Sequence, residues 1–205
     1  MKYRVAVLVV VLLGSAACVR LRIPAPEVHD YRLDYPPPAV TGTPLAAVLR
    51  VLPLGVAAIY DREPIVYRED AYSTGTYFTS RWSANPGSMV ADLLARDFAY
   101  SQLYRAVQQG PSTVPADYQL GGDIDEIEER SVAGGCAAHL AVRCTLVPLR
   151  GATNPIALQT TYAEDEACAC NDPRALAAAM SGALARVSAR LQRDVYDAIA
   201  AATPR

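Results

Sequence analysis

Five carboxylates are concentrated in one short stretch of the chain: Asp123, Asp125, Glu126, Glu128 and Glu129. Paired carboxylates can perform general acid–base catalysis, and closely spaced ones can bind calcium. This stretch lacks the ligand spacing and the central glycine of an EF-hand loop. Because carboxylates at this density favour solvent, we expect them on the exposed face and at the end of a strand.

The two histidines of the chain, His29 and His139, give little indication of catalysis. His29 lies in a proline-rich segment, and His139 falls on the polar side of an alternating strand, where a surface or hydrogen-bonded histidine is expected. No nucleophile elbow, phosphate loop, dinucleotide fingerprint or zinc-protease motif is present in the sequence. We therefore predict no catalytic residues, no metal site and no cofactor, and we do not expect an enzyme.

The first 18 residues have the layout of a lipoprotein export signal. Lys2 and Arg4 precede the apolar run Val5–Leu13, which is too short to span a bilayer. The following Ser15-Ala16-Ala17-Cys18 resembles a lipobox, with Ser15 where leucine is usual. We predict a signal peptide over residues 1–17 and lipidation of Cys18. The alternative is ordinary cleavage at the same bond, which would leave Cys18 unmodified.

The residue after the cysteine is Val19 rather than aspartate, which by resemblance to enteric sorting signals favours an outer-membrane anchor facing the periplasm. Residues 18–44 are rich in proline, which favours extended chain over helix. We predict that residues 18–44 form the lipidated cysteine and a tether to a domain over residues 45–205. Within this segment only Tyr31–Leu33 is expected to be a strand, and a disordered linker is the alternative elsewhere.

Four cysteines remain after Cys18: Cys136, Cys144, Cys168 and Cys170. An even number in an exported protein indicates disulfides. A zinc site is the alternative, but Cys168-Ala169-Cys170 lacks the usual two-residue spacer and the compartment is oxidising. If the strands around Gly151 form a hairpin, Cys136 lies opposite the Cys168 region. We predict a bridge from Cys136 to Cys168 or Cys170, and the state of Cys144 remains open.

Short apolar runs with β-branched and aromatic residues, bounded by turn residues, predict seven strands of the domain. They are Val48–Leu54, Ala57–Tyr60, Ile65–Arg68, Thr74–Arg81, Tyr118–Ile127, Ala137–Pro148 and Ile156–Tyr162. The last two are joined by a turn over residues 150–155.

Two helices are predicted, over about residues 86–109 and 172–202. Asn85-Pro86 supplies a cap and a first-turn proline for the first helix, and Gly110-Pro111 follows its expected end. Asp172 and Pro173 start the second helix in the same way, and its apolar residues recur at helical spacing. Strands then helix, repeated twice, indicate an α/β fold, a single domain with a mixed β-sheet packed with two main helices.

The charge balance of the chain bears on its partners. Without Lys2 and Arg4, 17 of the 19 basic residues remain against 21 acidic ones. Such a chain would neutralise few phosphates, so we expect no nucleic-acid partner. On the second helix Arg186, Arg190 and Arg193 form a basic row with Asp194 and Asp197 within reach. We interpret this row as a solvated face, and contact with lipid headgroups is the alternative.

A family resemblance rests on the opening strands. Val51-Leu52-Pro53-Leu54, Tyr60-Asp61-Arg62, Ile65-Val66-Tyr67-Arg68 and Arg81-Trp82, leading into a helix, resemble the ABC-type transport auxiliary lipoprotein component family. The similarity extends from about Tyr31 to the C-terminus. It implies a non-catalytic envelope lipoprotein of a lipid transport system of the Mce or paraquat-inducible (Pqi) type, acting between the inner and outer membranes. Its partners would be an Mce-domain protein and the ABC permease and ATPase.

The alternative function is an assembly or scaffold lipoprotein of another envelope machine, such as a secretion channel. Under either function the domain would act by binding, to a partner or to further copies of itself as a homo-oligomer. The candidate partner-binding residues are Tyr67, Tyr72, Tyr77, Arg68 and Arg81, because aromatic and arginine side chains dominate interface energies. We expect Arg68 and Arg81 to be exposed, since burial would require carboxylate partners, and Trp82 to fill the end of the core.

Overall fold

The longest strand, β7 (Tyr118–Val132), organises the sheet in this computed structural model, which describes residues 25–110, 112–150 and 156–202. On one side β7 pairs antiparallel with β8 (Gly135–Pro148), and β8 pairs antiparallel with β9 (Leu158–Cys168). On its other side three shorter strands pair in parallel with successive parts of β7. They are β2 (Leu45–Val51), β3 (Gly55–Val56) and β4 (Pro64–Arg68).

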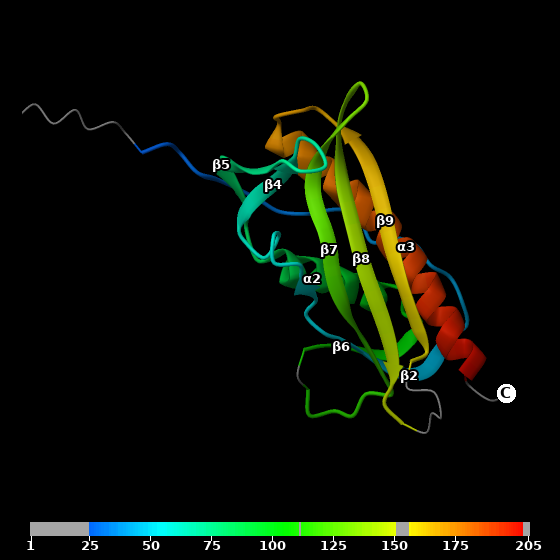
Figure 1. The fold of residues 1–205 in the computed structure, drawn as a ribbon. Coiled ribbons are helices and arrows are strands. Elements are labelled where there is room, and N and C mark those ends of the chain that lie inside the picture. The colour runs from blue at the N-terminus through cyan, green and yellow to red at the C-terminus, as the bar shows by residue number, and fades with distance from the viewer. Residues whose placement is uncertain (1–24, 111, 151–155, 203–205) are drawn as a thin grey trace, which may run out of the picture.

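Three further strands and two helices complete the domain (Figure 1). The strand β6 (Tyr104–Gln109) lies beside β2, β5 (Thr74–Trp82) pairs with β4, and β1 (His29–Tyr31) pairs with β5. The helices α2 (Pro86–Tyr100) and α3 (Pro173–Ala202) contact each other and pack behind the sheet in Figure 1. The predicted α/β fold with one mixed sheet is therefore confirmed.

The helix α3 has the bounds and the buried face that the sequence predicts. The Asp172 carboxylate accepts hydrogen bonds from the backbone amides of Arg174 and Ala175, which caps the first turn. The predicted apolar stripe is fully buried against the sheet: Leu176, Met180, Leu184, Val187, Leu191 and Val195. Burying one such side chain contributes about 2 kcal/mol, so this stripe is a large part of the core.

The helix α2 is shorter than predicted. It ends at Tyr100 rather than near residue 109, and Gln102 adopts a φ of 56° that no helix accepts. The chain then reverses into β6, where Tyr104 and Val107 still contact the core. These two residues continue the helical spacing of the sequence by coincidence, which is why the prediction was wrong beyond Tyr100.

The opening of the domain also differs from the predicted strands. The expected strand Ala57–Tyr60 is a tight turn after β3, because the backbone amides of Tyr60 and Asp61 both donate to the Ala57 carbonyl, over 2.7 Å and 3.1 Å. The first strand spans His29–Tyr31 rather than Tyr31–Leu33. Tyr60, at the end of this turn, is buried.

Part of the segment predicted as a tether packs into the core. Leu33 and Tyr35 are buried, and the Tyr35 hydroxyl donates to the Asp97 carboxylate over 2.7 Å. Ser188 of α3 donates to the same carboxylate over 2.6 Å. The packed domain therefore includes the chain from His29 onward. The predicted signal peptide, Cys18 and the turn at residues 151–155 lie outside the described residues.

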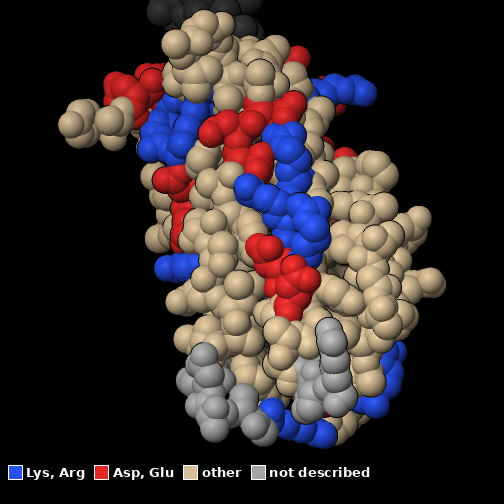
Figure 2. All heavy atoms as spheres, turned by 90° about the vertical axis from the view of Figure 1, so that its right-hand side faces the viewer, with Lys and Arg blue, Asp and Glu red and all other residues tan. Residues whose placement is uncertain are grey.

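The outer edge of β9 is contacted by arginines from α3. Arg186 donates to the carbonyl of Asp165, and Arg190 donates to the carbonyl of Ala163, both over 3.2 Å. The same guanidinium groups pair with Glu164 and Glu166 at 2.6–2.9 Å. On this side of the molecule basic and acidic atoms are intermixed (Figure 2). The counterions of Arg186 and Arg190, two of the three arginines in the predicted basic row, are thus on β9 rather than on the helix itself.

Neither helix within residues 25–202, leaving aside the gaps, is both long and apolar enough for a membrane crossing.

Candidate functional site

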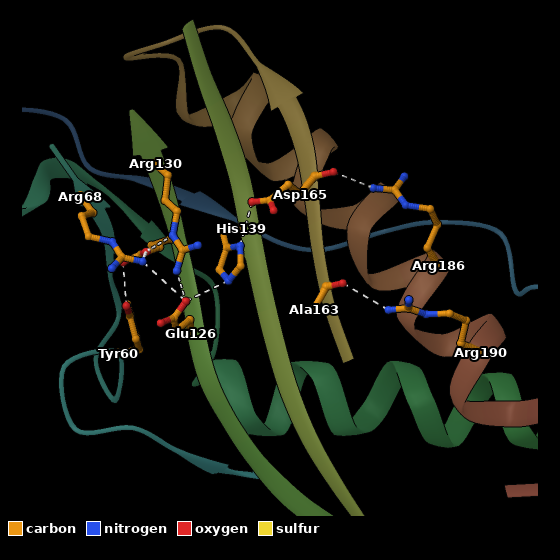
Figure 3. Close-up of polar contacts among 10 residues, drawn as sticks. Tyr60, Arg68, Glu126, Arg130, His139, Ala163, Asp165, Arg186 and Arg190 are labelled. Atoms are coloured by element: carbon orange, nitrogen blue, oxygen red, sulfur yellow. Dashed lines mark hydrogen bonds and ion pairs between the residues drawn. The ribbon is translucent and has the colours of Figure 1, made fainter. Parts of the chain in front are cut away.

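Glu128 is the centre of a charged network on the face of the sheet opposite the helices. Its side chain is fully buried, and it accepts hydrogen bonds from the Tyr60 hydroxyl at 2.6 Å and from Arg130 Nε at 2.6 Å. Arg68 donates a further hydrogen bond to the same carboxylate. The three donors come from the turn after β3, from β4 and from β7 itself (Figure 3).

The network continues across the sheet through Glu126 and His139 (Figure 3). Glu126 pairs with Arg130, lies 3.5 Å from Arg68 and lies 2.9 Å from His139 Nε2. The other ring nitrogen of His139, Nδ1, lies 2.8 Å from Asp165 on β9. A carboxylate therefore faces each nitrogen of this buried ring. The network links β4, β7, β8 and β9.

The network perturbs the groups that form it. Burial, together with the hydrogen bond to Glu128, raises the pKa of Tyr60. Burial and the neighbouring Arg68 guanidinium lower the pKa of Arg130. The carboxylates of Glu126 and Glu128 are neutralised by arginines, and the Tyr60 hydroxyl is engaged. This arrangement suits a structural role, because it leaves no obvious nucleophile or general base free to act on a substrate.

Two expectations about exposure were wrong. Glu128 and Glu129 are buried rather than at the exposed end of a strand, because β7 continues to Val132 and the counterions of Glu128 come from distant parts of the chain. Arg68 is only 27 % exposed and is paired within the domain. Arg81 is more exposed, as expected, and pairs with Asp30 at 2.6 Å and with Glu63 at 3.3 Å. Its hydrogen bond to Asp30 raises the pKa of Arg81.

Aromatic residues of β4 and β5 lie at the end of the sheet near the β7–β8 turn. The rings of Tyr67 and Tyr77 pack edge to face, 5.4 Å apart. Tyr72, in the turn between β4 and β5, is 98 % exposed, and Phe78 is 87 % exposed. Trp82 is buried in the core, as expected. Phe78 was not predicted as a candidate, although a phenylalanine that alternates with threonines in a strand is a sequence signal for a surface position.

A hollow of about 470 Å³ lies at this end of the domain, and we call it the end hollow. Strand residues of β4, β5, β7 and β8 line it, together with the residues just before α3. The lining residues are Tyr67, Glu69, Thr76, Tyr77, Phe78, Glu129, Ser131, Gly135, Cys136, Cys170 and Asn171. The end hollow thus brings together two predicted partner-binding residues, Tyr67 and Tyr77, whereas Arg81 lies away from it.

The predicted disulfide borders the end hollow. Cys136 is bonded to Cys170, with their Cα atoms 5.1 Å apart. Cys168 lies directly opposite Cys136 in the β8–β9 ladder, but its half-buried thiol is free, and burial and Glu129 raise its pKa. Cys144 is a free, buried thiol whose pKa is raised to about 12 by burial. No three histidine, cysteine, aspartate or glutamate side chains within the described residues are grouped to hold a metal ion.

The family was identified by comparison with known protein families. The model of the ABC-type transport auxiliary lipoprotein component matches residues 31–192, which span the domain from the end of β1 into α3. The chain belongs to the ABC-type transport auxiliary lipoprotein component family. The resemblance of the opening strands is therefore confirmed. The family is one of auxiliary transport components and not a known enzyme family. No curated protein matches the chain.

Solved structures share the fold of this auxiliary lipoprotein. Protein XCC0632 from Xanthomonas campestris, of family DUF330, superposes with a TM-score of 0.75 at 20 % identity, over 86 % of this chain and all of that chain. The hypothetical protein CT253 from Chlamydia trachomatis gives a TM-score of 0.57 at 12 % identity, over 77 % of this chain and 99 % of that one. At these identities the likeness establishes the fold alone.

Proposed function

We propose that this auxiliary lipoprotein is a non-catalytic component of an Mce- or Pqi-like lipid transport system that acts between the inner and outer membranes. The family match over residues 31–192 carries the proposal. In this role Cys18 is lipidated and anchors the chain in the outer membrane, with the domain facing the periplasm. An Mce-domain protein, the permease and the ATPase of the same system are the partners.

The contacts of the domain support a binding role. The carboxylates of Glu126 and Glu128 pair with arginines of the same chain. The charged network therefore stabilises the sheet and leaves few free groups for catalysis. Tyr72, in contrast, is 98 % exposed in the turn between β4 and β5, so its ring contributes nothing to the packing of the core. A bare aromatic ring is typical of an interface anchor.

Co-purification from native envelope membranes tests the proposal. The tagged protein should recover an Mce-domain protein together with the permease and ATPase, and Tyr72→Ala should reduce that recovery. Tyr100→Ala is the matched control, because Tyr100 is a 66 % exposed ring at the end of α2. Recovery of none of these partners with the unaltered protein would refute the proposed function. The apparent mass of the purified protein reports self-association in the same preparation.

The anchor is tested separately with Cys18→Ala. We expect this variant to become a soluble periplasmic protein or an unprocessed precursor, whereas the unaltered chain fractionates with the outer membrane. Unchanged membrane fractionation together with unchanged acyl labelling in the variant would show that Cys18 is not the anchor.

A further inference from the structure

A buried carboxylate without a cationic partner opens onto the end hollow. Glu129 is only 6 % exposed, lines the hollow and accepts a hydrogen bond from the Tyr77 hydroxyl over 3.0 Å. None of the ion pairs found among the described residues includes Glu129. Burying a carboxylate without an opposite charge is unfavourable, so this position is poised for a cation.

The register of the sheet explains why no arginine neutralises Glu129. Arg68 and Arg130 are paired across β4 and β7, one position after the pair formed by Tyr67 and Glu129. Successive side chains of a strand point to opposite faces, so both arginines project to the other face and bind Glu128 there. Among the residues that line the end hollow, all of them described, there is no lysine or arginine.

The remaining walls of the end hollow suit a cation that carries apolar groups. Tyr67 and Tyr77 form an edge-to-face pair beside Glu129. Aromatic faces attract ammonium groups and bind their methyl or methylene groups by contact. The volume of about 470 Å³ falls within the range of small-molecule sites, roughly 300–1,000 Å³.

We propose that the end hollow is a binding site for an alkylammonium group, with Glu129 as the counter-charge and the rings of Tyr67 and Tyr77 as the walls. The bound cation supplies the positive charge that no ion pair of the described residues provides for Glu129. Such a group is available on a phospholipid headgroup of the ethanolamine type or on a free amine, and the recognition chemistry is the same for both. The site does not depend on the proposed transport role.

Amide chemical shifts of the mature, full-length protein in dodecyl maltoside micelles provide the measurement. Tetramethylammonium and ethanolamine are titrated at constant ionic strength, with neopentyl alcohol as a neutral probe of similar shape. We expect saturable shifts at residues lining the end hollow for the two cations and none for the alcohol. Dihexanoyl phosphatidylethanolamine and dihexanoyl phosphatidylglycerol then separate the two sources of the group.

Two variants test the assigned roles. Glu129→Gln keeps an acceptor for the Tyr77 hydroxyl but removes the charge, and we expect affinity to fall by about tenfold or more. Tyr67→Leu removes one ring of the aromatic pair but keeps an apolar side chain, and should weaken binding roughly twofold to fivefold. Glu63→Gln removes an equally negative but 63 % exposed carboxylate elsewhere and should leave binding unchanged.

Tighter binding of the ethanolamine phospholipid than of ethanolamine supports the site and assigns it to the lipid headgroup, and equal binding supports the site with a free amine as sufficient. Absence of saturable shifts with both cations overturns the proposal. So does binding that survives both Glu129→Gln and Tyr67→Leu. If Glu129→Gln does not fold, the Tyr67→Leu result decides.

Discussion

The Tyr60 hydroxyl lies 2.6 Å from the Glu128 carboxylate, although the two residues are 68 positions apart in the sequence. This hydrogen bond connects the turn after β3 to the C-terminal half of β7. Arg68 and Arg130 bind the same carboxylate, so one buried acid holds three segments of the sheet. Removing a donor from it leaves a buried charge incompletely paired.

Arg68→Ala should therefore lower the free energy of unfolding by about 2–3 kcal/mol, because Glu128 is fully buried while Arg130 remains as a partner. Urea unfolding followed by circular dichroism measures this change. Arg81→Ala is the control, since its partners Asp30 and Glu63 are exposed, and its unfolding midpoint should stay close to that of the unaltered protein. Equal midpoints for both variants would contradict the structural role of Arg68.

Gly122→Ala should prevent folding or destabilise the domain by more than about 3 kcal/mol. Gly122 has a φ of 152°, and a Cβ there would lie 1.9 Å from the carbonyl oxygen of Arg143 on β8. Gly121→Ala is a matched control in the same strand, because its nearest neighbour, Leu52 Cδ1, is 3.7 Å away. Soluble yield and thermal melting compare the two, and a Gly122→Ala protein as stable as Gly121→Ala would refute the assigned close approach.

Peptide mapping of the oxidised protein should recover Cys136 linked to Cys170, with Cys168 as a free thiol. Cys136→Ala opens a loop with a sequence separation of 34 residues and should lower stability by about 3–4 kcal/mol. Cys168→Ala should leave the crosslink and most of the stability in place. A linkage of Cys136 to Cys168 as the main product would contradict the pairing.

Cys144 should contribute to a loss of stability at alkaline pH. Burial raises the pKa of its thiol from 9.0 to about 12, so the folded chain holds the thiol proton more tightly than the unfolded chain. The contribution is therefore complete below pH 9 and is lost as the pH rises toward 12. Buried tyrosines share this sign, so the test is the difference between the unaltered protein and Cys144→Ala, whose stability should fall less steeply. Parallel slopes, or iodoacetamide labelling of folded Cys144 near pH 8, would count against it.

The parts of the fold that the sequence predicted correctly are those determined by local signals. Asp172 and Pro173 mark the start of α3 in the sequence, and the spacing of its apolar residues identifies the buried face. The pairing of Cys136 with the Cys168–Cys170 region followed from the hairpin alone. The end of α2 was misplaced because Tyr104 and Val107 keep a helical spacing after the chain has already reversed at Gln102.

The candidate site was harder to predict from the sequence, because its charged residues pair with partners that are far away along the chain. Glu128 was expected to be exposed because its neighbours in the sequence are also acidic, whereas its partners Tyr60 and Arg68 lie 68 and 60 positions away. Tyr67 and Tyr77 were recognised as candidates by residue type alone. Their proximity to Glu129 depends on the registers of β4 with β5 and of β4 with β7, which no local pattern specifies.

The two α3 arginines that donate to β9 carbonyls affect how copies of this protein meet one another. Among the strands that the structure describes, β9 is paired only with β8, so its other backbone edge would offer a template for strand addition by a second chain. Arg186 and Arg190 occupy that edge at Asp165 and Ala163. An incoming strand must first displace two charged side chains that are also paired with glutamates. The edge is thereby protected against aggregation even where many copies are crowded together.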